Sequence, residues 1–143
     1  MSTERRVAVD ASALVAWACN ERGANTVSRL LAFSVAPASA MTETLYRARE
    51  RGHGMEIPRL QKAILAMGVE VEPITEDDCT VAARIIEVSR LNRQKRDDPC
   101  LSLGDGLCIA VAERLNLVIT GGDNYWGQIW PHLNLAIQFH PFR

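Results

Sequence analysis

Four acidic residues are the side chains best placed to do chemistry in this sequence: Asp10, Glu43, Asp105 and Asp123. Asp10 ends a short apolar run, and the stretch LSLGDGLCIAVAERLNLVITGGD carries the last two. An ionised carboxylate in apolar surroundings is costly unless it is paired or hydrogen-bonded. Each of the four therefore needs a partner, which could be a backbone cap, a cation or a bound metal ion.

Short apolar runs alternate along the chain with segments of helical pattern. We expect strands at 6–9, 35–40, 69–74, 117–120 and 135–140, and helices at 11–19, 25–33, 42–52, 57–68, 75–91, 102–116 and 124–130. This alternation predicts the α/β class, with a mainly parallel central sheet flanked by helices. The length of 143 residues predicts a single domain, residues 1–143.

The predicted elements bring the four carboxylates to one edge of the sheet. In open α/β sheets, ligands bind beyond the carboxyl ends of the strands. Asp10 and Asp123 each follow a strand, and Asp105 lies in the first turn of the helix that leads into the strand before Asp123. Glu43 lies at the start of a helix entered from the second strand. The sequence therefore predicts one acidic site.

Each carboxylate also has a purely structural interpretation. Asp10, Asp105 and Asp123 all fit helix caps, and Glu43 fits an i,i+4 pair with Arg47 that is worth only about 0.3–0.5 kcal/mol. These interpretations remain open for every residue taken singly. Convergence of these side chains on one point would favour a functional site.

A second capping pattern occurs elsewhere in the sequence without an expected acidic site. Ser102 and Asp105 have the spacing of a capping box, and so do Thr75 and Asp78. The helix that Asp78 begins has no acidic strand end expected beside it. Capping alone therefore does not distinguish a site from an ordinary helix start.

Several carboxylates in one pocket favour a bound hard cation. Like charges about 4 Å apart repel by roughly 4 kcal/mol at the effective dielectric constant of a protein surface. An all-oxygen ligand set favours Mg²⁺ or Mn²⁺, which can activate a water and stabilise charge on a phosphoryl oxygen. A zinc site is not expected, because the cysteines and histidines lack ligand spacing: Cys19, Cys79, Cys100, Cys108, His53, His132 and His140.

Four segments of the sequence resemble a known family. The segments VAVDASALVAW, ASAMTETLYRAR, LSLGDGLCIAVAERLNLVITGGD and the following NYW are similar to PIN-domain ribonucleases of the VapC toxin type. The resemblance covers nearly the whole chain, and the order Asp10, Glu43, Asp105, Asp123 is similar to that family's metal-binding quartet. It implies a PIN-like fold and Mg²⁺- or Mn²⁺-dependent hydrolysis of RNA phosphodiester bonds. It also implies a VapB-like antitoxin partner in a type II toxin–antitoxin pair, and a homodimer.

One feature departs from the family pattern. The family usually has threonine, one small residue and then aspartate, whereas here two glycines separate Thr120 from Asp123. The extra residue shifts the carboxylate by up to about 3.5 Å unless the glycines absorb it. Asn124 could then substitute or assist. Ser12 and Thr120 are supporting candidates for hydrogen bonds to ligands or metal-bound waters, with backbone satisfaction as the alternative.

Basic residues near two of the carboxylates are candidates for substrate binding. They are Arg47, Arg93, Lys95 and Arg96. A solvated surface is the alternative interpretation. The formal net charge is −1, so an anionic substrate would depend on such local patches or on a bound cation.

Two other functions compete with that of a nuclease. A catalytically silent PIN-like module that binds RNA or a protein is the main alternative, with the Thr120–Asp123 spacing as its discriminator. A phosphotransfer receiver would need a further acidic residue near Asp10 and a lysine after a late strand, but no lysine follows residue 95. The N-terminus has no signal-peptide pattern and no apolar run approaches about 18 residues, so we expect a cytoplasmic protein with reduced thiols.

Overall fold

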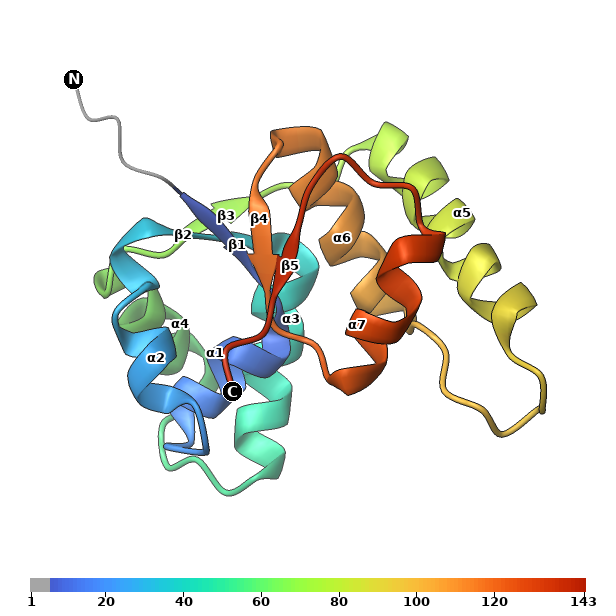
Figure 1. Cartoon of the computed structure of the whole chain (residues 1–143). Helices are drawn as coiled ribbons and strands as arrows, with labels where there is room; N and C mark the ends of the chain where they lie inside the picture. Colours follow the sequence, from blue (N-terminus) through green and yellow to red (C-terminus); the bar gives the residue numbers. More distant parts are fainter. Residues whose placement is uncertain (1–5) are drawn as a thin grey trace.

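A computed structural model describes residues 6–143 (Figure 1). Residues 1–5, which include the charged Glu4 and Arg5 of the predicted N-terminal pattern, lie outside the described residues. The strands are β1 (Val7–Val9), β2 (Ser34–Pro37), β3 (Glu70–Glu72), β4 (Val118–Thr120) and β5 (Phe139–His140). The helices are α1 (Ala11–Ala18), α2 (Ala24–Ser28), α3 (Ala38–Glu50), α4 (Ile57–Ala66), α5 (Glu76–Asn92), α6 (Leu103–Leu115) and α7 (Asn124–Ile129), with short 3₁₀ turns at Leu31–Phe33 and Trp130–His132.

The five strands form one sheet in the order β3-β2-β1-β4-β5, and all four neighbouring pairs are parallel. The central strand β1 pairs Val9 with Thr120 of β4, so both strands end at the same level. The predicted α/β class with a parallel sheet flanked by helices is confirmed. Within residues 6–143, no helix is long and apolar enough to cross a membrane.

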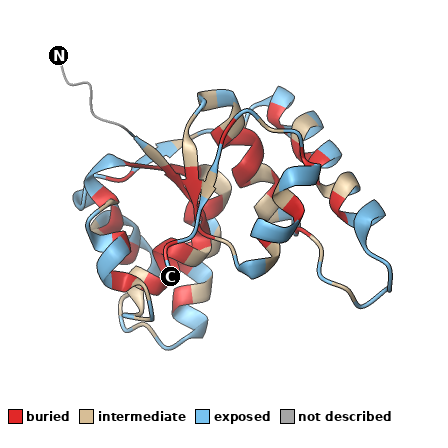
Figure 2. Ribbon diagram, in the orientation of Figure 1, coloured by how far each residue is buried: buried red, intermediate tan, exposed pale blue. Residues whose placement is uncertain are grey.

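The sheet divides the buried apolar side chains into two cores. One contains residues of α5, α6 and α7, and the other contains residues of α1 to α4. Ala8 and Val9 are adjacent in β1, yet they belong to different cores, because successive strand residues point to opposite faces. Figure 2 shows this buried material concentrated on the sheet and on the helix sides that face it.

Several predicted boundaries were wrong, including the start of the helix expected at 42–52, which begins at Ala38. The segment 25–33 is not one helix: α2 stops at Ser28, and after the 3₁₀ turn Ser34 Oγ donates to Leu30 O at 2.8 Å. The strand expected at 35–40 ends at Pro37, because the chain there already enters α3.

The last strand is also shorter than predicted. Of the expected 135–140, only Phe139–His140 pairs with β4. The backbone N–H groups of Ala136 and Ile137 donate instead to the Glu113 carboxylate, at 3.1 and 3.3 Å. A side chain of α6 therefore replaces a strand partner for this part of the chain.

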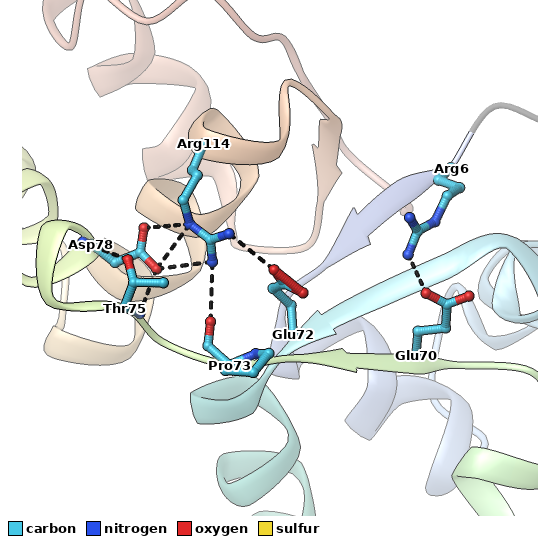
Figure 3. Close-up of polar contacts among 7 residues, drawn as sticks. All are labelled: Arg6, Glu70, Glu72, Pro73, Thr75, Asp78 and Arg114. Carbon is cyan, nitrogen blue, oxygen red and sulfur yellow. Dashed lines mark hydrogen bonds and ion pairs between the residues drawn. The ribbon is translucent and has the colours of Figure 1, made fainter.

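Arg114 of α6 joins β3 to the start of α5 (Figure 3). Its Nε donates to Asp78 Oδ1 at 3.0 Å, its Nη1 to Glu72 Oε1 at 2.9 Å, and its Nη2 to Pro73 O at 3.1 Å. Asp78 is only 2% exposed, and it also closes the predicted capping box with Thr75. The expectation that no acidic strand end lies beside Asp78 was wrong, because Glu72 ends β3 and shares the same guanidinium.

We expect Arg114→Met to lower the free energy of unfolding by about 2–4 kcal/mol, because it leaves the buried Asp78 carboxylate without its cation. Urea denaturation at neutral pH measures the change. Arg6→Met is the matched control: it removes a guanidinium from the exposed ion pair with Glu70, also drawn in Figure 3, and should cost less than about 1 kcal/mol. Equal losses in the two variants would contradict this account of Arg114.

Candidate active site

Asp10 lies where β1 ends and α1 begins. Its backbone N–H donates to Thr120 O at 3.0 Å, which ties it to the end of β4. Its side chain is the N-cap of α1: Oδ2 accepts from Ser12 N at 3.3 Å and from Ser12 Oγ at 3.0 Å. Asp10 is only 4% exposed, so these hydrogen bonds hold a nearly buried carboxylate in place.

Asp105 lies in the first turn of α6, close to Asp10. It forms the predicted capping box, in which Asp105 Oδ2 accepts from Ser102 N at 2.9 Å and Ser102 Oγ accepts from Asp105 N at 3.1 Å. Burial raises the pKa of Asp105 to about 6, and the negative charges of Asp10 and Glu43 contribute to this rise against the hydrogen bonds from Ser102. Three carboxylates from the end of β1, from α3 and from α6 therefore share one electrostatic environment.

Glu43 lies close to the start of α6. A Cβ atom added to Gly104 would lie 2.4 Å from Glu43 Oε1, so a larger residue at this position would displace the end of the Glu43 side chain. The other oxygen, Oε2, accepts from Arg47 Nη1 at 2.8 Å. The predicted i,i+4 pair with Arg47 is therefore present, and the Glu43 charge acts on Asp105. The convergence of all four carboxylates on one metal ion stays a prediction.

The two glycines between Thr120 and Asp123 both adopt positive φ values. Gly121 and Gly122 have φ values of +136° and +67°, a region that favours glycine. Gly122 N donates to Ser12 Oγ at 2.7 Å, so Ser12 connects this loop to Asp10. Thr120 itself is buried, and its carbonyl rather than its hydroxyl makes the contact with Asp10.

Asp123 is the N-cap of α7 and lies at the surface. Its Oδ1 accepts from Tyr125 N at 3.0 Å, and the exposed Asn124 begins the helix. Asp123 also lines a cavity beyond the Gly121–Gly122 loop, on the side of β5. Its predicted part in an acidic quartet stays a prediction.

Two residues that contribute to the site were not recognised from the sequence in this role. Gly104 is one. A glycine inside the first turn of a helix is unusual, and this could have drawn attention to it. Cys108, one turn after Asp105, is the other: burial raises the pKa of its thiol well above the usual range, and the Asp10 charge adds to the effect. The thiol therefore stays protonated beside Asp10, with Ser39 Oγ 3.9 Å from its sulfur.

The candidate substrate-binding residues are divided between two places. Arg47 lies against Glu43, whereas Arg93, Lys95 and Arg96 belong to the exposed loop between α5 and α6. That loop is held by its own contacts, such as Lys95 N to Asp98 Oδ2 at 2.9 Å. In the described part of the chain, no hydrogen bond or ion pair joins these three residues to the acidic cluster of Asp10, Glu43 and Asp105.

The acidic cluster offers the ligand chemistry of a hard divalent cation. Its donors are carboxylate oxygens, and the neighbouring Cys108 is a neutral thiol rather than a thiolate. Among residues 6–143, no three acidic, histidine or cysteine side chains already stand in metal-holding geometry. A cation would compete with Arg47 for Glu43, and it would relieve the repulsion that Asp105 experiences. Asp10, Glu43 and Asp105 therefore fit such an ion in donor type and charge.

The sequence profile of the PIN domain family matches residues 7–127, and the chain belongs to this family. The predicted PIN-like fold and the resemblance that led to it are confirmed at this level. Comparison with curated protein sequences finds no match.

Several solved structures share the fold. VapC20 of Mycobacterium tuberculosis, described as a sarcin-ricin loop cleaving toxin, has a TM-score of 0.60 at 20% identity, over 85% of this chain and 93% of that one. A toxin–antitoxin complex from Klebsiella pneumoniae has a TM-score of 0.60 at 15% identity, over 82% and 86%. FitAcB from Neisseria gonorrhoeae has a TM-score of 0.63 at 16% identity, over 92% and 96%. At these identities the likeness concerns the fold.

The two capping boxes allow a matched test of the acidic cluster. The pKa of Asp105 is raised above its ordinary value, whereas hydrogen bonds from Arg114 and Thr75 outweigh burial and lower that of Asp78. In metal-free buffer, we expect Asp105→Asn to raise the free energy of unfolding at pH 7 by about 1–2 kcal/mol. The shift to about 6 corresponds to roughly 3 kcal/mol, and a weaker cap offsets part of it.

The pH dependence has opposite signs in the two variants. The advantage of Asp105→Asn should be absent below about pH 4, grow as pH rises to about 6 and then level off, because only the ionised carboxylate bears the cost of burial and of the neighbouring charges. Asp78→Asn should destabilise the protein at pH 7, and this loss should shrink as pH falls through the lowered pKa of Asp78. Urea denaturation at several pH values measures both. A loss of stability in both variants at pH 7 would contradict the repulsion at Asp105.

Proposed function

We propose that this protein is a metal-dependent endoribonuclease that hydrolyses RNA phosphodiester bonds. The observation that carries the proposal is that Asp10, Glu43 and Asp105, from three separate elements of a PIN-family fold, are near enough for the charges of the first two to raise the pKa of the third. An ordinary fold gains little from such a gathering of like charges. A nuclease needs it, because the bound cation then faces the phosphate of its substrate.

The chain's own residues have distinct parts in this proposal. Asp10 and Asp105 are fixed by their caps and would hold one or two Mg²⁺ or Mn²⁺ ions, while Glu43 would exchange part of its contact with Arg47 for the ion. A bound cation would supply a more acidic water and stabilise negative charge on the phosphoryl oxygens. Arg47, once released from Glu43, would be a candidate to contact a phosphate. Ser12 keeps Asp10 and the Gly122 loop in register.

We further propose that the protein is the toxin of a type II pair, with a VapB-like antitoxin and a homodimeric state. Family membership supports this, together with the likeness in fold to VapC20 and to structures described as toxin–antitoxin complexes. The place of the reaction is expected to be the cytoplasm. Co-purification of the chain with the product of a neighbouring small gene would test the partner directly.

The reaction is tested by incubating purified protein with total RNA in Mn²⁺ or Mg²⁺ and sequencing the new ends. We expect discrete cuts with 5′-phosphate ends, abolished by chelation and reduced at least a hundredfold in Asp105→Asn. Asp78→Asn is unsuitable as a control because it weakens the fold, so Asp77→Asn serves: it removes an exposed first-turn carboxylate from α5. Cutting by Asp105→Asn at the wild-type rate would refute the assignment of Asp105.

Metal binding is tested separately by thermal unfolding. A ligand that binds only the folded state raises the melting temperature by mass action. Millimolar Mn²⁺ should therefore stabilise the wild-type protein by a few degrees and stabilise the variant Asp10→Asn much less. An absence of any shift, combined with intact RNA binding, would favour the alternative of a catalytically silent PIN-like module.

A further inference from the structure

A cavity of about 780 Å³ lies on the far side of the Gly121–Gly122 loop from Asp10. Its lining combines the loop with α7 and the chain after β5, which lie side by side at the lower end of the sheet in Figure 1. The lining residues are Arg22, Gly121, Gly122, Asp123, Asn124, Gly127, Phe139, Pro141, Phe142 and Arg143. The volume falls in the range of small-molecule sites.

Only one backbone segment separates this cavity from the acidic cluster. Gly121 lies against Asp10, since an added Cβ would stand 2.4 Å from Asp10 Cβ, and Gly122 N donates to Ser12 Oγ. The same two glycines line the cavity. The cavity and the acidic cluster are therefore neighbours that share this loop.

The charges of the cavity favour an anionic ligand. Its charged side chains are two guanidinium groups, Arg22 and Arg143, against the single carboxylate of Asp123. Within residues 6–143, neither guanidinium forms an ion pair with a carboxylate; that of Arg143 lies 4.9 Å from the ring centroid of Phe142. Both arginines are exposed and remain available to a phosphate.

The uncharged lining suits the other parts of a nucleotide. Phe139 and Pro141 provide an apolar wall for a base or ribose, and Asn124 provides both a hydrogen-bond donor and an acceptor. A single-stranded polynucleotide joins these features, with phosphates alternating with flat apolar groups. A folded protein partner would need a wider apolar surface than this lining offers.

We propose that this cavity binds the nucleotide next to the scissile phosphate of an RNA strand, with Arg22 and Arg143 contacting its backbone phosphate. This inference rests on the proposed function and identifies where the substrate lies. It places the strand across the Gly121–Gly122 loop, so that one phosphate reaches the acidic cluster while the adjoining one is held by the arginines. The arginines are positioning residues and take no part in bond cleavage.

Binding is measured with a fluorescent single-stranded oligoribonucleotide of mixed sequence and the variant Asp105→Asn, which leaves the RNA uncut. In that background, Arg22→Gln together with Arg143→Gln should weaken binding at least tenfold. The double variant should also flatten the dependence of log affinity on log salt by roughly 0.7 for each phosphate that is no longer neutralised by an arginine. Arg29→Gln, which removes an exposed arginine outside the cavity, is the matched control and should change neither quantity.

A second variant tests the cavity by filling it. A Cβ added to Gly127 meets no atom within 4 Å, so Gly127→Leu should fold normally and occupy the space with its side chain. We expect it to weaken RNA binding about as much as the arginine substitutions. Gly54→Leu is the control, because Gly54 is equally open but lies at a different cavity.

The outcomes separate this inference from the proposed nuclease activity. If wild-type protein cuts RNA with Mn²⁺ but the arginine and Gly127 variants bind and cut normally, the cavity assignment is wrong and the nuclease proposal stands. If no cutting occurs yet binding depends on Arg22, Arg143 and Gly127, the cavity assignment stands without the reaction. Failure of the protein to bind the oligoribonucleotide, or loss of binding in Arg29→Gln alone, would overturn the inference.

Discussion

The structure depends on holding three carboxylates together against their mutual repulsion. A pair of like charges about 4 Å apart costs roughly 4 kcal/mol at an effective dielectric constant of about 20. The caps at Asp10 and Asp105 offset part of this cost, since each is worth about 1 kcal/mol and the positive end of a helix adds about 0.3–1 kcal/mol. These terms do not offset the cost at Asp105, where burial first and the charges of Asp10 and Glu43 next raise the pKa of the carboxyl to about 6. The fold therefore carries an electrostatic cost that a cation would remove.

The carboxylates that cap the helices are also candidate site residues. Asp10, Asp105 and Asp123 each accept a backbone N–H at a helix start, as the purely structural interpretation requires. The cap limits the rotation of the carboxylate and leaves part of its hydrogen-bonding capacity for another partner. Asp78 shows the contrasting case. It forms an equivalent capping box with Thr75, but its buried negative charge is neutralised by Arg114 of the same chain. The partner of the carboxylate, and not the cap, distinguishes the two helix starts.

Much of this arrangement was predictable because it follows from local patterns. The helix caps of α5 and α6, the buried β1 and the position of Asp10 after it are all encoded within a few neighbouring residues. The parts that failed depend on contacts between distant residues. Glu113 diverts residues 136 and 137 from the last strand, and Arg114 brings Glu72 to Asp78, and no local pattern indicates either contact. The approach of Glu43 to Gly104 likewise joins positions 61 residues apart.

The conformation of the two glycines after β4 decides where the fourth carboxylate, Asp123, lies. With φ values of +136° and +67°, the loop can pass directly over Asp10, where a side chain at position 121 would collide with it. The same path carries Asp123 outward to cap α7 and to line the neighbouring cavity. The extra residue therefore does more than lengthen a turn. The loop has Asp10 against Gly121, and its two glycines also line the cavity that Arg22 and Arg143 border.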